Sequence, residues 1–179
     1  MRKLIFSIFV VLSLTWVPAA RAADIQGTFF LVPEKSDNVA HIEESILAKM
    51  NFFVRSFARD KISKVARVHK RVSIALAGKE ISIVADDYTL PPVPTDGSIL
   101  MYHNREGDVL RLRTRLEGNK LEQTFLADNG SRTNFCELSQ DGNTLQMRVM
   151  IKSDYFDEPM KYTLVYCKNP SLPMAKAFY

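Results

Sequence analysis

The hydrophobic pattern of this 179-residue chain changes its period partway along, and this change constrains the fold more than any other feature. Residues 25–32 form one extended apolar run, which Pro33 ends. Apolar residues then recur every three or four positions as far as residue 68, a spacing typical of amphipathic helices. From Arg71 onward they alternate with polar residues, which is typical of half-buried strands joined in hairpins. A strand, a helical pair and a long meander predict a mainly β protein, an antiparallel up-and-down β-barrel with a helical pair inserted after the first strand.

The start of the chain has the pattern of an export signal. Arg2 and Lys3 precede a short apolar core, and Ala20-Arg21-Ala22 offers a small-x-small cleavage site. We therefore expect residues 1–22 to be a signal peptide and the protein to be exported, either periplasmic or secreted. A retained anchor is the alternative, although the apolar stretch is short for a membrane span.

The charge of the chain gives no basis for a nucleic-acid partner. The chain has 24 Lys and Arg against 20 Asp and Glu, a net charge of +4. Arg2, Lys3 and Arg21 belong to the expected leader, so the mature chain keeps 21 basic against 20 acidic residues, a net charge of +1. Its length suits one domain, residues 23–168, followed by a tail, residues 169–179.

The helical segment, residues 39–68, is predicted to cover the barrel. Ser36-Asp37-Asn38 supplies capping side chains for a first helix over residues 39–57, and Asp60 can cap a second, shorter one. The apolar stripe of the first helix consists of Val39, Ile42, Ile46, Met50, Phe53 and Phe57. We expect this helix to close the barrel through Ile42, Ile46, Met50, Phe53 and Phe57, with Phe53 either in the core or lining an open portal.

About nine strands are predicted, with turns marked by glycine and asparagine. They are residues 25–32, the two arms of a hairpin around Gly78-Lys79, and residues 98–103, 108–116, 120–127, 131–138, 143–152 and 161–168. The proline-rich stretch 90–94 cannot be a central strand, because proline lacks the N–H that a ladder needs. Asp86-Asp87 falls at a turn and is interpreted as solvated.

Short motifs along nearly the whole mature chain resemble one known family. They are Gly27-Thr28-Phe29, Ser36-Asp37-Asn38, the hairpin around Gly78, Asp128-Asn129-Gly130, Asp141-Gly142-Asn143 and Thr163-Leu164-Val165-Tyr166. Together they resemble the fatty-acid-binding-protein branch of the calycin (lipocalin-like) barrels. The resemblance implies a barrel that holds a small hydrophobic ligand. The chain departs from the family in its strand count, its longer helical segment and its export signal, because the family has ten strands and is mostly cytosolic.

The resemblance also implies that the chain lacks the family's carboxylate clamp. In the family, two interior arginines and a tyrosine hold a fatty-acid carboxylate. The tyrosine matches Tyr166, but Leu164 stands at the position of one arginine, and Cys136 or Glu137 at the other. Each lost charge-assisted hydrogen bond is worth roughly 1.5–3 kcal/mol. A free fatty acid held in the family's way is therefore disfavoured.

Strand alternation predicts the wall of the binding site. The predicted ligand-binding residues are Leu112, Thr114, Gln123, Phe125, Met147, Val149, Ile151, Tyr162, Leu164 and Tyr166, with Phe53 and Phe57 from the lid. Such a wall suits an uncharged or amphiphilic lipid-like ligand. The alternative is a barrel filled by these side chains, with no cavity. Arg111, Arg113 and Arg115 face outward and are interpreted as a solvated stripe.

No pattern for catalysis, metal binding or a cofactor stands out. His41, His69 and His103 are far apart and share no metal-ligand spacing. No nucleophile elbow, phosphate loop or dinucleotide motif is found, so we expect no catalytic residues, no metal and no cofactor. Cys136 and Cys167 are not expected to form a disulfide, because the strand between theirs separates them by about 9–10 Å, beyond the ~7 Å limit for a bridge.

Three classes of function follow. The first is an exported binding protein that carries or stores a small hydrophobic ligand. The second is a protein-interaction module of the cell envelope or secretome, a filled barrel that docks a partner by its helices or rim loops. A partner in the envelope or on a membrane surface stays open under either hypothesis. An enzyme is third, since barrels of this type sometimes acquire isomerase or hydrolase sites.

Overall fold

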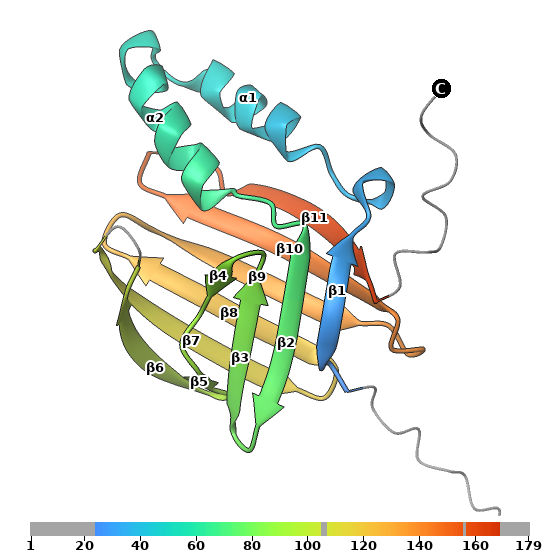
Figure 1. Ribbon diagram of the computed structural model, residues 1–179. Helices are drawn as coiled ribbons and strands as arrows, with labels where there is room; N and C mark the ends of the chain where they lie inside the picture. The colour runs from blue at the N-terminus through green and yellow to red at the C-terminus, as the bar shows by residue number, and fades with distance from the viewer. Residues whose placement is uncertain (1–23, 105–106, 156, 169–179) are drawn as a thin grey trace, which may run out of the picture.

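The structure is a computed structural model that describes residues 24–104, 107–155 and 157–168. The expected signal peptide and C-terminal tail lie outside these residues. The fold is mainly β: an antiparallel sheet curves into a half-barrel, and two helices lie over one end of it (Figure 1). These helices, α1 (Val39–Lys49) and α2 (Phe52–Val65), are called the lid. A short 3-10 helix, η1 (Pro33–Lys35), precedes them.

The sheet contains every strand of the described chain in one curved layer. The strands are β1 (Gly27–Leu31), β2 (Arg71–Ala77), β3 (Glu80–Ala85), β4 (Tyr88–Thr89), β5 (Val93–Pro94), β6 (Asp96–His103), β7 (Val109–Glu117), β8 (Lys120–Ala127), β9 (Gly130–Leu138), β10 (Thr144–Ser153) and β11 (Met160–Cys167). Their order is β4-β3-β2-β1-β11-β10-β9-β8-β7-β6, and β5 also pairs with β3. The mainly β prediction with a helical pair after the first strand is confirmed.

The strand prediction holds because turn chemistry and alternation are local signals. Apart from the two-residue strands β4 and β5, every strand in the described part of the chain corresponds to a predicted one. The proline-rich stretch contributes only these two short strands, as the missing N–H groups require. Pairing of β1 with β11 joins the start of the domain to its end, with Leu31 opposite Tyr166.

The half-barrel has a seam between β6 and the strands before it. Among the described residues β6 pairs with β7 alone, so its other edge faces the segment that carries β4 and β5. Two hydrogen bonds cross near this seam. The Tyr88 and Tyr102 hydroxyl oxygens lie 3.3 Å apart, and the Leu116 N–H donates to the Thr95 carbonyl at 3.1 Å.

The lid differs from the prediction because the first helix ends early. Met50 has extended backbone angles, φ −84° and ψ 154°, and Asn51 then caps α2 by accepting a hydrogen bond from the Phe53 N–H. The predicted helix over residues 39–57 is therefore wrong. Asp60 does not cap a helix but lies within α2, 3.3 Å from the Lys64 ammonium group.

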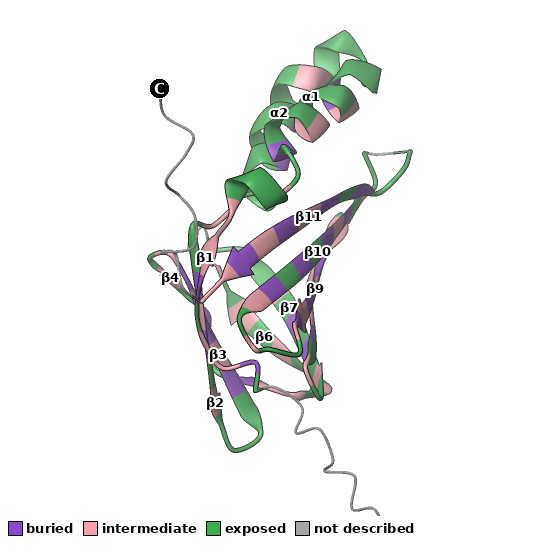
Figure 2. Ribbon diagram, turned by 90° about the vertical axis from the view of Figure 1, so that its right-hand side faces the viewer, coloured by how far each residue is buried: buried purple, intermediate pink, exposed green. Residues whose placement is uncertain are grey.

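Beyond the helix break, the phenylalanines of α2 point away from the barrel. Phe53 is 86% exposed and Phe57 is 60% exposed, whereas Ala58 and Ile62 form the buried side of α2. The prediction that Phe53 and Phe57 help to close the barrel is therefore wrong. Its other residues, Ile42, Ile46 and Met50, do pack against the core. Figure 2 shows the contrast, with mostly exposed helices above strands that carry the buried positions. No helix in the described residues is long and apolar enough to cross a membrane.

Candidate ligand-binding barrel

The ten strand residues predicted to form the wall lie on one face of the sheet. The pairing register places Tyr162 opposite Val149, Leu164 opposite Met147, and the Leu112 position opposite Phe125. All ten are buried except Phe125, which is partly buried. Their contact with a ligand remains a prediction, but the structure brings them together around one interior.

The interior also contains a row of neutral polar side chains. Thr114 on β7 lies opposite Gln123 on β8, which in turn lies opposite Asn134 on β9. These side chains are 0%, 4% and 7% exposed. Asn134 was not among the predicted residues, although alternation along β9 places it on the same face as Cys136.

The linker, residues 66–70, joins α2 to β2 and is held by side chains from the barrel wall. The Tyr162 hydroxyl donates to the Ala66 carbonyl, and the Tyr166 hydroxyl donates to the His69 carbonyl, both at 3.1 Å. Burial raises the pKa of both tyrosines, so each stays a neutral phenol that can donate. The two predicted ligand-binding hydroxyls therefore already have partners in the linker.

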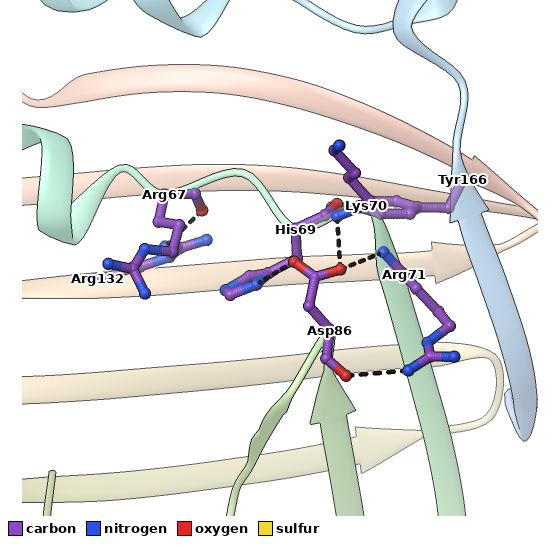
Figure 3. Close-up of polar contacts among 7 residues, drawn as sticks. All are labelled: Arg67, His69, Lys70, Arg71, Asp86, Arg132 and Tyr166. Atoms are coloured by element: carbon purple, nitrogen blue, oxygen red, sulfur yellow. Dashed lines mark hydrogen bonds and ion pairs between the residues drawn. The ribbon is translucent and has the colours of Figure 1, made fainter. Parts of the chain in front are cut away.

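Arg132 holds the same region from β9. Its Nη1 donates to the carbonyl of Val65 at 2.7 Å, and its Nε donates to Asn134 Oδ1 at 2.9 Å. The same Nη1 lies 3.4 Å from the Arg67 carbonyl (Figure 3). Its strand position faces Phe125 and Ile151, so it belongs to the inner face. The sequence prediction missed this interior cation. Counting back from Cys136 along β9 in steps of two, first to Asn134 and then to Arg132, would have found it.

Asp86 fixes the other side of the linker. One carboxylate oxygen accepts from the backbone N–H groups of Lys70 at 3.0 Å and Arg71 at 2.9 Å, and the other lies 3.1 Å from His69 Nδ1 (Figure 3). Asp86 has a left-handed φ of 54°, a conformation that aspartate tolerates at turns. The interpretation of Asp86 as simply solvated is therefore wrong.

The surroundings of the linker set the protonation states of His69 and Asp86. Burial lowers the pKa of His69, and the charge of Arg132 adds to this, despite the hydrogen bond with Asp86. Burial acts to raise the pKa of Asp86, but hydrogen bonds from Arg71 and His69 bring it below its ordinary value. At neutral pH, His69 is therefore a neutral imidazole beside the ionised carboxylate of Asp86. This arrangement suits a structural role in positioning the linker.

Two clefts flank the base of the lid. One, of about 540 Å³, lies between the helices and the linker and is lined by Val39, Ala40, Glu43, Asp60, Ser63, Lys64, Ala66, Arg67 and Val68. The other, of about 380 Å³, lies beside η1 and is lined by Leu31, Pro33, Ser36, Asp37, Asn38, Val39, Ala40, Val68 and Leu164. Among the predicted wall residues, only Leu164 reaches them.

The remaining sequence candidates are dispersed. Cys136 is buried on the inner face and Cys167 is partly exposed. The two do not form a disulfide, and β10 lies between their strands. Burial raises the pKa of Cys136 to about 12, so it stays protonated. No three His, Cys, Asp or Glu side chains in the described residues gather as metal ligands.

We expect Tyr166→Phe to lower the free energy of unfolding by about 1–2 kcal/mol, because the partly buried His69 carbonyl would lose its donor. Tyr162→Phe should behave similarly through Ala66. Urea denaturation measures both effects. Tyr155→Phe is the control, because Tyr155 is 54% exposed and its change should cost little. Equal stability of all three variants would show that the linker is not held in this way.

Comparison with known proteins supports the fold. No family model matches the chain, and no curated protein matches it either. Among solved structures, the fatty-acid-binding protein of Manduca sexta is 17% identical, with a TM-score of 0.51, covering 80% of this chain and 99% of that one. A Schistosoma mansoni fatty-acid-binding protein, solved in complex with arachidonic acid, is 14% identical, with a TM-score of 0.51, covering 83% and 98%. The chain has the fatty-acid-binding-protein-like calycin fold.

Proposed function

We propose that this protein is an exported binding protein that carries or stores a small hydrophobic ligand, uncharged or amphiphilic, inside the half-barrel. The observation that carries the proposal is the way the lid is attached to the barrel. The large side chains of α2 do not fill the mouth, since Phe53 and Phe57 point to solvent. The end of α2 and the linker are instead held to the wall by hydrogen bonds from Arg132, Tyr162 and Tyr166.

The wall and the fold support the same proposal. Ten inward residues from β7, β8, β10 and β11 offer an apolar surface with a few hydrogen-bonding groups, which is the usual composition of a ligand site. The likeness to fatty-acid-binding proteins adds a fold in which such an interior can enclose a ligand. Neither a cofactor nor a nucleic-acid partner is part of the proposal.

Native mass spectrometry of protein purified from its own host, followed by lipid extraction, tests the proposal. We expect a bound hydrophobic molecule that extraction removes. Leu164→Trp should reduce its occupancy by filling the interior, whereas Val165→Trp, on the opposite face of β11, should not. Circular dichroism checks that both variants fold. Protein that never carries a ligand, alone or after exposure to host lipids, would favour a filled barrel.

Export is a separate prediction. Cleavage after Ala22 should give a mature protein that begins Ala23-Asp24-Ile25. N-terminal sequencing of protein from its host measures this, with cell fractionation as a parallel readout. A full-length product that remains in the cytosol would contradict export while leaving ligand binding open to test.

The second candidate function is a protein-interaction module of the cell envelope or secretome. The observation that favours it is a group of phenylalanines on α2, where Phe52, Phe53 and Phe57 are 76%, 86% and 60% exposed. Phe52 and Phe53 meet edge to face, with ring centroids 5.8 Å apart. Exposed apolar groups of this kind often mark contact surfaces.

Cross-linking in host envelopes would test the second candidate. A Phe53→Ser/Phe57→Ser variant should lose its cross-linked partner. An Ile99→Ser/Met101→Ser variant is the control, because those side chains are also exposed, at 57% and 58%, but lie on β6. Loss of the partner in both variants, or in neither, would contradict docking through the lid.

A further inference from the structure

Two members of the polar row of the interior (Thr114, Gln123 and Asn134) differ from every other polar group of the wall described above. Thr114 Oγ1 and Gln123 Nε2 are buried and have no hydrogen-bond partner among the described residues. Directly opposed side chains on antiparallel strands lie about 4.5–5.5 Å apart at Cβ. The two unpaired atoms therefore belong to neighbouring positions on one inner surface.

Other buried polar side chains of the sheet have hydrogen-bond partners within the protein. On the outer face of β8 and β9, Thr124 and Thr133 are buried and their hydroxyl oxygens lie 3.2 Å apart. The Tyr162 and Tyr166 hydroxyls donate to linker carbonyls. A buried donor without a partner costs free energy, so proteins rarely retain one without a use for it.

We infer that Thr114, Gln123 and Asn134 form a subsite for one uncharged hydrogen-bonding group of an otherwise hydrophobic ligand. A ligand hydroxyl fits best, because it can accept from Gln123 Nε2 and also exchange a hydrogen bond with Thr114 Oγ1. This inference rests on the proposed function and narrows the ligand to chains or rings that carry an alcohol-like group.

The chemistry of the row explains why the group is uncharged. All three side chains are neutral amides or hydroxyls. The inward-facing cation, Arg132, already donates to the Val65 carbonyl and to Asn134 Oδ1. A carboxylate placed against Thr114 and Gln123 would lose its hydration without gaining a cation, which is costly in a buried site. A hydroxyl loses much less and satisfies the unpaired donor.

Paired ligands and paired variants test the subsite. Hexadecanol and hexadecane compete with a fluorescent hydrophobe for the full mature protein. We expect Gln123→Leu to lower the affinity for hexadecanol about tenfold, which corresponds to the loss of about one good hydrogen bond. The affinity for hexadecane should change by no more than about twofold. Thr114→Val should act in the same direction. The melting temperature of Gln123→Leu should not fall, because Gln123 Nε2 has no hydrogen-bond partner among the residues that the structure describes.

Thr133→Val is the control, because its hydroxyl pairs with Thr124 on the outer face. It should lower the melting temperature and leave the ratio of the two affinities unchanged. Equal weakening of both ligands by Gln123→Leu, or no weakening of either, would overturn the subsite while leaving the carrier intact. A wild-type protein that binds neither ligand would overturn the proposed function, and the subsite with it. A fall in the melting temperature of Gln123→Leu would show that the amide is bonded within the protein, and would also overturn the subsite.

Discussion

Replacing Phe29 by alanine should lower the free energy of unfolding by about 3–5 kcal/mol, the usual cost of emptying a buried phenylalanine site. Phe29 on β1 is 0% exposed and lies opposite Val72 on β2. The lost side chain would leave a cavity at the strand that joins the two ends of the domain. Urea or guanidinium denaturation, monitored by circular dichroism, measures the change.

Phe53→Ala is the matched control, because the same side chain is 86% exposed on α2. It should change the free energy of unfolding by no more than about 0.5 kcal/mol, as surface substitutions usually do. A loss at Phe53 comparable with that at Phe29 would mean that α2 packs its aromatic face into the barrel in solution. The difference between the two variants therefore measures directly which side of α2 faces the protein.

A long-chain alcohol or methyl ester should bind at least about tenfold more tightly than the fatty acid of equal chain length at neutral pH. The wall offers hydroxyls and amides, and Leu164 stands where the resemblance to fatty-acid-binding proteins implies an arginine. Arg132 does face inward, but its hydrogen bonds go to Val65, Arg67 and Asn134. Calorimetry with the matched ligands measures the difference.

The pH dependence of this preference has a defined sign. The neutral acid is the form that an apolar wall accepts, so the affinity for the fatty acid should rise as the pH falls toward the pKa of its carboxyl group. The affinity for the alcohol should stay constant over the same range. Tighter binding of the acid at neutral pH, weakened by Arg132→Met or Tyr166→Phe, would instead reveal a carboxylate site at the mouth.

The strands could be predicted from the sequence because their signals are local. Period-two alternation and glycine-containing turns delimit β8 as residues 120–127, the bounds that the structure gives. The inner face followed from the same alternation, which is why the predicted wall residues on the strands lie together. Only the short strands β4 and β5, next to prolines, carried too little pattern to be recognised.

The lid and the linker could not be predicted, because they depend on contacts distant in sequence. The apolar stripe of the helical segment runs through Met50 without interruption, so it concealed the break that Asn51 caps. Arg132 meets the carbonyl of Val65 across 67 positions of the chain. Asp86 meets Lys70 across 16 positions. The sequence around one residue of such a contact does not indicate which distant residue it will meet.

The attachment of the linker also sets an order of assembly. The Tyr162 and Tyr166 hydroxyls come from β11, the last strand of the chain, and β1 needs β11 as one of its two neighbours. A nascent chain that has not yet reached Met160 therefore holds both its first strand and its helices without their final partners. Such long loops must close before their contacts stabilise them, which slows folding. The helices, made early, can take their final place only after synthesis is nearly complete, because the hydrogen bonds that hold the linker come from β11.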